Sequence, residues 1–154
     1  MTFTFREAEQ EDLPSLVDML ADDVLGQTRE DTSEPLNTAY LEAFSHIDSS
    51  PDNELIVIEA EGKVAGMMQL TFIPYLTHTG TLRCLIEGVR IHAEFRGQGQ
   101  GTKMIQWAIS RAEQKGCALV QLTTDKQRPD AIRFYEDLGF EATHEGFKLK
   151  LSQA

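Results

Sequence analysis

The sequence predicts an α+β or mixed α/β fold, a layered domain in which short strands and helices alternate. Its 154 residues suit one domain of ordinary size, and a content of 41% hydrophobic and 25% charged residues is typical of globular proteins. Strand-like and helix-like stretches follow each other without a repeat or a long linker. These three observations predict a single domain over residues 1–154.

The N-terminal part of the chain predicts strands, an amphipathic helix and a hairpin. Apolar residues recur at helical spacing over 13–20, after Asp12, which is a favoured helix N-cap. The polar run at 26–37 is typical of a loop, and Glu61–Lys63 is typical of a tight hairpin turn. We expect strands at residues 3–6, 54–60 and 64–72, a helix after Asp12, and a short helix at 38–47.

The C-terminal part predicts two further helices between strands. An apolar stripe over 104–112 predicts a helix that stops at Gly116. Pro129 stands at a favoured first helical position, and Gly139 ends the helix that follows. We expect strands at Thr81–Ile91, at Ala118–Thr123 as a buried parallel neighbour of the first, and at Phe147–Leu151.

Charge and apolar patterning exclude several classes of protein. The 14 Lys and Arg against 25 Asp and Glu give a net charge of −11, which argues against a nucleic-acid binder with a broad basic surface. No apolar run approaches the roughly 20 residues needed to span a bilayer, and the first residues lack the pattern of a signal peptide. We expect a cytoplasmic protein without a membrane partner, in which Cys84 and Cys117 are reduced and isolated.

The charge is distributed unevenly along the chain. Residues 1–61 hold 2 basic and 16 acidic side chains, a balance of −14, whereas residues 62–154 hold 12 and 9, a balance of +3. A mildly positive half suits a phosphorylated ligand, and an acidic half attracts a cation. An acidic face that serves solubility explains the same count.

The predicted strand Thr81–Ile91 carries a carboxylate in an otherwise apolar row. In a regular strand, Glu87 shares one face with the alternate residues over 85–91. A buried, unpaired carboxylate has its pKa raised by desolvation, as a base acting near neutral pH requires. A strand bulge would change that face, and a structural ion pair with Arg83 or Arg90 is the alternative role.

A glycine-rich segment, Arg96–Thr102, stands between this strand and the next helix. A Rossmann fingerprint needs a glycine where Thr102 stands, and a Walker A loop needs Gly-Lys before Ser or Thr, whereas here Lys103 follows Thr102. What remains is a strand-to-helix turn whose bare backbone can approach an anion at the positive end of a helix. The segment therefore predicts a pyrophosphate site, with a flexible loop as the alternative.

Several stretches of the chain resemble the GCN5-related N-acetyltransferase (GNAT) superfamily. Arg96–Gly101 is similar to the family's R-x-x-G-x-G/A pyrophosphate loop, and Ile86–Phe95 resembles the strand and turn before that loop. Ala131–Phe140 resembles the late A-x-x-F-Y-E-x-L-G-F helix motif. Arg6–Pro14 is similar to the family's first strand and helix, so the resemblance spans essentially the whole chain.

The chain departs from the family pattern at two positions. Ala93 stands where the family often has Pro, and Arg128 stands three residues before Ala131, where the family often has Asn. The usual cofactor contact from that second position is therefore in doubt. An arginine there could instead meet a phosphate of coenzyme A.

The resemblance implies a GNAT-like fold: a mixed, mostly antiparallel, twisted sheet with a splayed parallel strand pair, flanked by about four helices. It implies acetyl transfer from acetyl-CoA to an amine in the wedge between the Thr81–Ile91 and Ala118–Thr123 strands. Glu87 would accept the ammonium proton, directly or through water, and Tyr135 would protonate the departing thiolate, or serve only as a packed aromatic. The cofactor would be bound by Val89, Arg90, Ile91, Arg96, Gly97, Gln98, Gly99, Gln100, Gly101, Thr102 and Arg128.

This chemistry requires neither a metal nor a covalent acyl-enzyme, so we expect both cysteines and His46, His78, His92 and His144 to be non-catalytic. A small-molecule N-acetyltransferase is favoured by the presence of Glu87 and Tyr135. A catalytically silent acyl-CoA sensor and a protein N-terminal or lysine acetyltransferase are the alternatives, and a homodimer is compatible with each. A cationic acceptor is favoured if the mouth of the cleft is ringed by Asp22, Asp23, Glu30, Asp31 and Glu34, beside Tyr75 and His78.

Overall fold

The structure, a computed structural model, describes residues 2–152. The chain divides into two compact units, Met1–Gln121 and Leu122–Ala154, and each is described by itself. The first unit holds nearly all of the sheet and most of the helices, and the second holds one helix and the C-terminal segment. None of the helices within residues 2–152 is long and apolar enough to cross a membrane.

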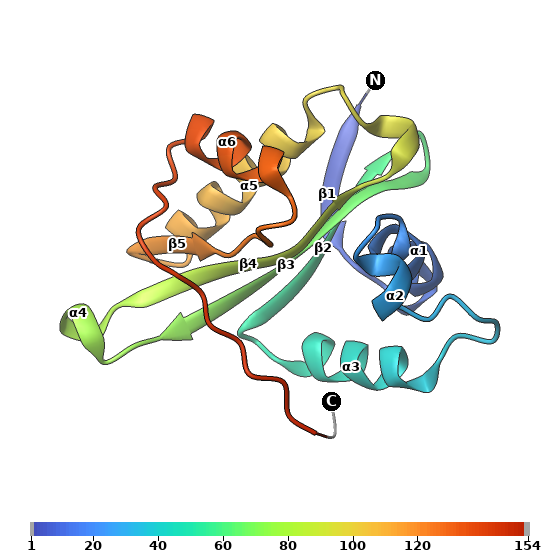
Figure 1. Cartoon of the computed structure of the whole chain (residues 1–154), viewed down its shortest axis with the longest axis horizontal. Coiled ribbons are helices and arrows are strands. Elements are labelled where there is room, and N and C mark those ends of the chain that lie inside the picture. The colour runs from blue at the N-terminus through green and yellow to red at the C-terminus, as the bar shows by residue number, and fades with distance from the viewer. Residues whose placement is uncertain (1, 153–154) are drawn as a thin grey trace. The chain divides into compact units, whose positions relative to one another are not determined.

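A sheet of five strands in the order β1-β2-β3-β4-β5 forms the centre of the first unit (Figure 1). β1 to β4 are antiparallel neighbours, and β5 completes the sheet as the parallel neighbour of β4. The Ala118 amide donates to the Leu82 carbonyl at 2.9 Å, where these last two strands begin. The predicted mixed sheet is confirmed. Its strands are β1 (Phe3–Glu7), β2 (Asn53–Ala60), β3 (Lys63–Pro74), β4 (Leu82–Ile91) and β5 (Leu119–Leu122).

Four of the helices follow the predicted positions, and two four-residue helices are additional: one lies inside the predicted loop at 26–37, and one lies between the predicted strands at 64–72 and Thr81–Ile91. One of the short helices begins at Gly26. Only glycine fits at this position, because a Cβ would collide with the Leu20 carbonyl oxygen. The Asp23 carboxylate accepts a hydrogen bond from the Gly26 amide at 2.5 Å and fixes this start. The helices are α1 (Leu13–Ala21), α2 (Gly26–Arg29), α3 (Thr38–Ser49), α4 (Thr77–Gly80), α5 (Gln100–Gln114) and α6 (Pro129–Asp137), with 3-10 turns at Gln10–Asp12 and Ala93–Phe95.

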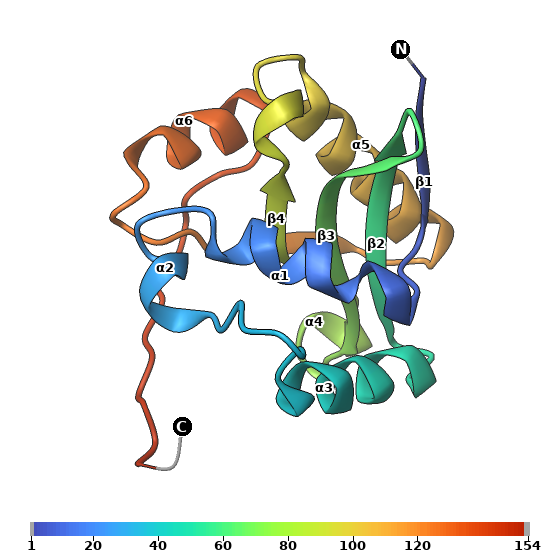
Figure 2. The same ribbon diagram turned by 90° about the vertical axis from the view of Figure 1, so that its right-hand side faces the viewer.

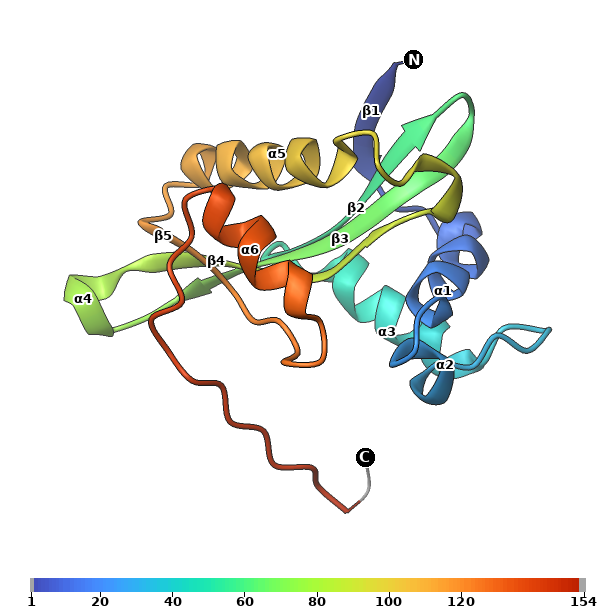
Figure 3. The same ribbon diagram turned by 45° about the horizontal axis from the view of Figure 1, so that its top comes forward.

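Within the first unit, α5 covers one face of the sheet, while α1 and α3 cover the other (Figures 2 and 3). A cluster of buried side chains joins α1 and α3 to the sheet, and each such side chain contributes roughly 1.5–3 kcal/mol by leaving water. On the other face, Met104 and Ile105 of α5 are fully buried. The cluster beneath α1 and α3 consists of Ala8, Leu13, Leu16, Met19, Phe44, Val57 and Met67.

β4 carries a β-bulge at Gly88 and Val89. The pairing of β3 with β4 shifts between Met67 and Gln69, so that two residues of β4 stand opposite one residue of β3. Gly88 has a φ of +62°, in the left-handed region that favours glycine. The bulge therefore follows from a glycine inside a strand, next to the segment where the sequence predicts the cofactor.

The bulge separates side chains that a regular strand would align. Leu85 and Glu87 share one face of β4, as predicted. Ile91 lies on the opposite face, which α5 covers. It pairs with Gly66, and a Cβ added to Gly66 would stand 3.2 Å from the side chains of both Ile91 and Met104 of α5. The single apolar row predicted over 85–91 is wrong, because the extra residue in the bulge changes the alternation.

The hairpin between β3 and β4 ends in α4, at the far end of these two strands in Figure 1. His78 and Thr79 have φ values of 54° and 62°, a left-handed conformation that is uncommon for residues other than glycine. Each such residue costs about 1–3 kcal/mol and persists only where surrounding contacts hold it.

The second unit holds α6 and an exposed C-terminal segment. Gly139, with a φ of +97°, follows the end of α6, as predicted. The predicted strand Phe147–Leu151 is wrong, since no strand lies within residues 140–152. Phe147, Leu149 and Leu151 are instead 93%, 86% and 63% exposed. Their alternation with lysines is typical of a strand, but a strand also needs a neighbour for its backbone groups, which local sequence does not supply.

Candidate active site

Glu87 stands on β4 opposite Gln69, directly before the bulge. Its side chain is exposed, so the predicted burial is wrong. The physical reason is that the apolar cluster under α1 and α3 reaches Val57 and Met67 but includes no residue of β4. An exposed carboxylate can still exchange a proton with water, so the position remains suited to a water-mediated transfer.

Two arginine side chains bond to backbone carbonyl groups where β4 ends. Arg90 donates from Nη1 to the Val89 carbonyl oxygen at 2.9 Å, and Arg96 donates from Nε to the Ile91 carbonyl oxygen at 3.1 Å. The carbonyl groups of Val89 and Ile91 are therefore already hydrogen-bonded. A ligand that bonds to either carbonyl must share it with an arginine or displace that arginine.

The glycine-rich turn has the backbone conformation that its glycines predict. Gly97 and Gly99 have φ values of +76° and +78°. A Cβ on either residue would meet none of the described atoms within 4 Å, so the backbone here borders open space. The 3-10 turn before this segment is capped by His92, whose Nδ1 accepts from the Glu94 amide at 3.1 Å. The turn is therefore anchored at its start and accessible at its glycines.

α5 begins directly after Gly99 and directs its first backbone amides toward the turn. The Lys103 amide bonds to the Gly99 carbonyl at 3.3 Å, and the amides of Gln100, Gly101 and Thr102 precede that first helical bond. Amides in this position, at the positive end of a helix dipole, favour an anion. The residues present therefore fit a pyrophosphate group.

Two side chains brace this turn. Gln100 is only 4% exposed and donates from Nε2 to the Gln98 carbonyl at 3.2 Å. Arg96, besides its bond to Ile91, pairs through Nη2 with Asp22 at the end of α1 at 3.1 Å. Arg96 thus links the glycine-rich turn to the C-terminal end of α1 and to the last residue of β4.

Tyr135 and Arg128 belong to the second unit. Tyr135 is half-buried on α6, and its ring packs edge-on against Phe134 and Phe140, with centroids 5.0 and 5.8 Å away. Arg128 is the N-cap of α6, and its carbonyl accepts from the Ala131 amide at 3.1 Å. The roles predicted for both side chains concern a ligand bound to the first unit, and they stay predictions.

The sequence model of the acetyltransferase (GNAT) family matches residues 18–140, which include β4, the glycine-rich turn and α6. This chain belongs to the GNAT acetyltransferase family. It is therefore an acetyl-transferring enzyme, as the resemblance of its motifs implies.

Similar proteins agree with the GNAT assignment. The chain is 35% identical over 106 residues to the aminoalkylphosphonate N-acetyltransferase of Salmonella typhimurium, which covers 69% of this chain and 68% of that protein. A crystal structure of a transcriptional regulator from Bacillus halodurans C-125 is 54% identical, with a TM-score of 0.95 over 97% of this chain and 100% of that one. A predicted acetyltransferase from Clostridium acetobutylicum, solved with acetyl-CoA, shares the fold, with 19% identity and a TM-score of 0.74 over 99% of each chain.

In this GNAT enzyme, two of the acidic residues expected at the acceptor mouth form ion pairs with Arg90 and Arg96. Asp22 pairs with Arg96, and a carboxylate oxygen of Asp23 lies 3.9 Å from Nη2 of Arg90. Glu34 is exposed in the loop after α2. Two of the expected acidic groups are thus partly neutralised by arginine.

Two further acidic residues hold the loop between α2 and α3. Glu30 accepts a hydrogen bond from the Tyr40 hydroxyl at 2.8 Å. Asp31 accepts from the Ser33 amide at 3.0 Å and from Nδ2 of Asn37 at 3.1 Å. These hydrogen bonds lower the pKa of Asp31 to about 2. Both acids have a structural task, which local composition does not reveal.

The cysteines are free thiols with raised pKa values. Cys84 is buried on β4, and Cys117 is partly buried before β5. Burial, helped by the neighbouring Cys117 and Glu54, raises the pKa of Cys84 to about 12, and burial also raises that of Cys117. A thiolate nucleophile is disfavoured at both positions. Within residues 2–152 no three His, Cys, Asp or Glu side chains gather to hold a metal, and the expected absence of a metal stays a prediction.

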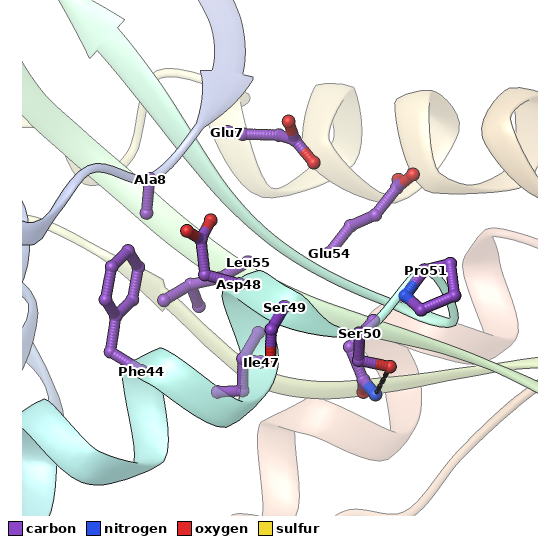
Figure 4. A pocket seen from close by; sticks show the side chains of 11 residues that line it. Glu7, Ala8, Phe44, Ile47, Asp48, Ser49, Ser50, Pro51, Glu54 and Leu55 are labelled. Atoms are coloured by element: carbon purple, nitrogen blue, oxygen red, sulfur yellow. Dashed lines mark hydrogen bonds between the residues drawn. The ribbon is translucent and has the colours of Figure 1, made fainter.

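A cavity of about 290 Å³ lies where β1, β2 and the end of α3 meet (Figure 4). Figure 4 shows the carboxylates of Glu7, Asp48 and Glu54 around it. Glu54 is buried and already accepts three hydrogen bonds from Arg111, one from Nη2 at 2.5 Å and two from Nε at 2.9 and 3.2 Å. No residue predicted for the site lines this cavity, and we assign it no chemistry. A second cavity of about 370 Å³ is lined by Asp18, Met19, Ala21, Asp22 and His92.

A polar cluster surrounds Arg83 on β4, and the sequence did not predict it. The Arg83 guanidinium lies over the Tyr75 ring, 4.4 Å from its centroid. Its Nη1 donates to Oε1 of Gln121 at 3.2 Å, and its Nη2 lies 3.0 Å from Nδ1 of His78. Gln121 in turn donates to the Tyr75 hydroxyl at 3.3 Å. The cluster joins the hairpin tip, β4 and β5, and its members lie too far apart in the chain for a local pattern to reveal them.

Proposed function

We propose that this GNAT enzyme transfers the acetyl group of acetyl-CoA to a primary amine by direct attack. The observation that carries the proposal is the turn in which two left-handed glycines in open space lead into the first amides of a 15-residue helix. Those amides suit a pyrophosphate, which acetyl-CoA carries. The membership of the GNAT family and the Clostridium acetobutylicum structure with acetyl-CoA support the same cofactor.

The backbone of β4 and the turn would hold the cofactor along its length. The amides from Gly97 to Thr102 would bind the pyrophosphate, with the charge of Arg96 beside them. The backbone of Val89–Ile91 would bind the pantetheine arm like an added strand, and an amide there would polarise the thioester carbonyl. Arg128 would meet a further phosphate. On cofactor binding, Arg90 and Arg96 would release their hydrogen bonds to the carbonyl groups of Val89 and Ile91.

The reaction forms one bond and breaks one. The nitrogen of the neutral amine attacks the thioester carbonyl carbon, the new C–N bond forms, and the C–S bond breaks to release the thiol of coenzyme A. The proton of the ammonium group would pass through water to Glu87, whose exposure suits such a relay. Tyr135 would supply the proton that the departing thiolate takes up. The nitrogen loses its second proton as the amide forms, and that proton would return through water to Tyr135. Glu87 would release the proton it accepted to solvent, so both side chains regain their starting protonation state and one proton is released per turnover.

A small-molecule acceptor is the function that we favour. The Salmonella typhimurium relative is named for acetylation of aminoalkylphosphonates, which are small amines. The alternatives are an acyl-CoA sensor without turnover and an acetyltransferase acting on protein N-termini or lysines. The expectation of a cationic acceptor gains no support from Asp22, Asp23, Glu30 or Asp31, because each of these has a structural partner.

Release of free thiol from acetyl-CoA tests the proposal across a panel of amino acids, aminoalkylphosphonates, polyamines, aminoglycosides and peptides. We expect thiol release that depends on a small amine and produces one acetylated amine per thiol. Acetyl-CoA binding without amine-dependent thiol release would support the sensor instead. Release with peptides alone would support the protein acetyltransferase.

We further propose that the enzyme is a cytoplasmic homodimer. Free thiols at Cys84 and Cys117 are compatible with a reducing compartment. The exposed apolar side chains of Phe147, Leu149 and Leu151 offer surface that a second copy would cover. Light scattering should give twice the 17.3 kDa mass of one chain, and a monomer at micromolar concentration would contradict the dimer.

A further inference from the structure

Arg83 has an unusual environment for a half-buried cation. Its three partners are the Tyr75 ring, the Gln121 amide and the imidazole of His78, and none of them is a carboxylate. A guanidinium has five N–H donors, and two of the Arg83 nitrogens reach these partners. Its Nε is shielded from solvent and has no hydrogen-bond partner among the described residues. Arg83 therefore retains donor capacity.

The charge of Arg83 is also not neutralised. Among the described residues, no Asp or Glu oxygen lies within 4.0 Å of it. Arg6, Arg90, Arg96 and Arg111, by contrast, all have a carboxylate partner. A partly buried cation without a counter-ion is stabilised by an anion that approaches it.

The position of Arg83 places this charge on the same side of the sheet as Glu87. Arg83 pairs with Ile73, Leu85 with Thr71 and Glu87 with Gln69, so all three β4 residues share the face opposite α5. Arg83 and Leu85 are half-buried and Glu87 is exposed, so this part of the face is only partly covered. At about 3.3 Å per residue, the Cα atoms of Arg83 and Glu87 are roughly 13 Å apart along the strand.

The hairpin tip holds this arrangement at a cost in backbone strain. His78 adopts a left-handed conformation, and its ring lies against the Arg83 guanidinium. Strain of this kind persists where surrounding contacts fix it, and it is concentrated at functional sites. The contacts to Tyr75 and Gln121 restrict the guanidinium further, so the donor group is preorganised.

We propose that Arg83 is a specificity-determining residue that binds an anionic group of the acceptor, a carboxylate or a phosphonate. The proposal rests on the proposed amine acetylation, and it names the class of acceptor as an amine that carries an anion at its far end. The amine lies toward Glu87 and the anion toward Arg83. The separation along β4 favours an extended acceptor, with several bonds between the two groups.

A chain-length series tests this assignment with matched acceptors. The probes are ω-aminocarboxylates and ω-aminoalkylphosphonates of two to eight carbons, each compared with the n-alkylamine of equal length, which has the same amine but no anionic group. In the unmodified enzyme we expect kcat/KM to be at least tenfold higher for the anionic acceptor at the longer lengths. The variant Arg83→Gln should lose that preference through a raised KM for the anionic acceptor, with the alkylamine changed by no more than about twofold.

Two further variants separate anion binding from a general effect on the fold. Arg83→Lys keeps the charge and should recover part of the preference. Arg29→Gln removes the same charge from the exposed surface of α2 and should change neither acceptor series. A preference for anionic acceptors that survives in Arg83→Gln, or an equal loss for both series, overturns the role of Arg83. Absence of thiol release with every amine overturns the proposed function itself.

Discussion

Gly99 has a φ of +78° at the start of α5, and Gly62 has a φ of +74° in the turn between β2 and β3. Both positions border open space, so a side chain at either would be opposed by the backbone conformation rather than by a collision. We expect Gly99→Val to weaken acetyl-CoA binding at least tenfold in calorimetry, because it distorts the phosphate-facing backbone. Gly62→Val is the matched control and should leave the affinity unchanged. An unaltered affinity for acetyl-CoA in a folded Gly99→Val protein would contradict the proposal that the cofactor binds at the glycine-rich turn.

The two proton-transfer residues should affect turnover more than binding. Glu87→Gln and Tyr135→Phe should each lower the maximal rate by about 100-fold to 10,000-fold at neutral pH, the usual contribution of a general base or acid. Acetyl-CoA affinity, measured in parallel, should change little because neither side chain is expected to bind the cofactor. A Glu87→Gln enzyme with full rate and an unchanged pH profile would place the base elsewhere.

Cys84 should be protected in the folded protein. Burial raises the pKa of its thiol to about 12, so the reactive thiolate is scarce below that pH in the native state and becomes accessible on unfolding. We expect alkylation of Cys84 by iodoacetamide at pH 8 to be slow until denaturant is added, as followed by mass spectrometry of the digested protein. Rapid native labelling at pH 8 would show that β4 opens at this position.

At the scale of elements, the Glu54–Arg111 pair joins β2 to α5. Arg111→Met would leave the buried Glu54 carboxylate without its partner, which we expect to lower the free energy of unfolding by about 2 kcal/mol. This value is below the range for fully buried pairs because the Arg111 side chain is 30% exposed. Adding Glu54→Gln should restore part of the loss, as measured by denaturant unfolding. A double variant less stable than Arg111→Met would refute this account of the pair.

Elements with strong periodicity are predictable from the sequence, and elements that depend on a neighbour are not. α1 and α5 follow from apolar spacing, and the hairpin after β2 follows from its turn residues. The bulge at Gly88 depends on the register with β3, and the missing strand at Phe147–Leu151 depends on a pairing partner. A glycine inside a strand indicates that a bulge is possible, but the local pattern fixes neither the register of the bulge nor the partner of a strand.

The candidate site divides in the same way. The turn from Arg96 to Thr102 is predictable because the backbone amides expected to bind the pyrophosphate are consecutive in the chain. The exposure of Glu87 depends on which helices cover β4, and the contact between Arg83 and Gln121 joins residues 38 positions apart. Both features depend on how the elements pack. The alternation of residues along β4 alone does not tell whether its Glu87 face is buried or partly exposed.

At the scale of the whole molecule, the charge asymmetry has a structural explanation. Asp22 and Asp23 of the acidic N-terminal part pair with two arginines of the basic part: Arg96 before the glycine-rich turn, and Arg90 on β4. Ion pairs therefore join the acidic residues 1–61, with a charge balance of −14, to the basic residues 62–154, with a balance of +3. This use of the acidic residues leaves less charge to attract a cationic acceptor.

The central claim is that this GNAT enzyme acetylates an amine through a cofactor held at the glycine-rich turn. Its most direct test measures free thiol and acetylated amine in one reaction, by thiol titration and mass spectrometry, for the unmodified enzyme and Gly99→Val. The account predicts one acetylated amine per thiol released and, below saturating acetyl-CoA, a rate in Gly99→Val at least tenfold lower. Thiol release without an acetylated product, or equal rates in the two proteins, would contradict it.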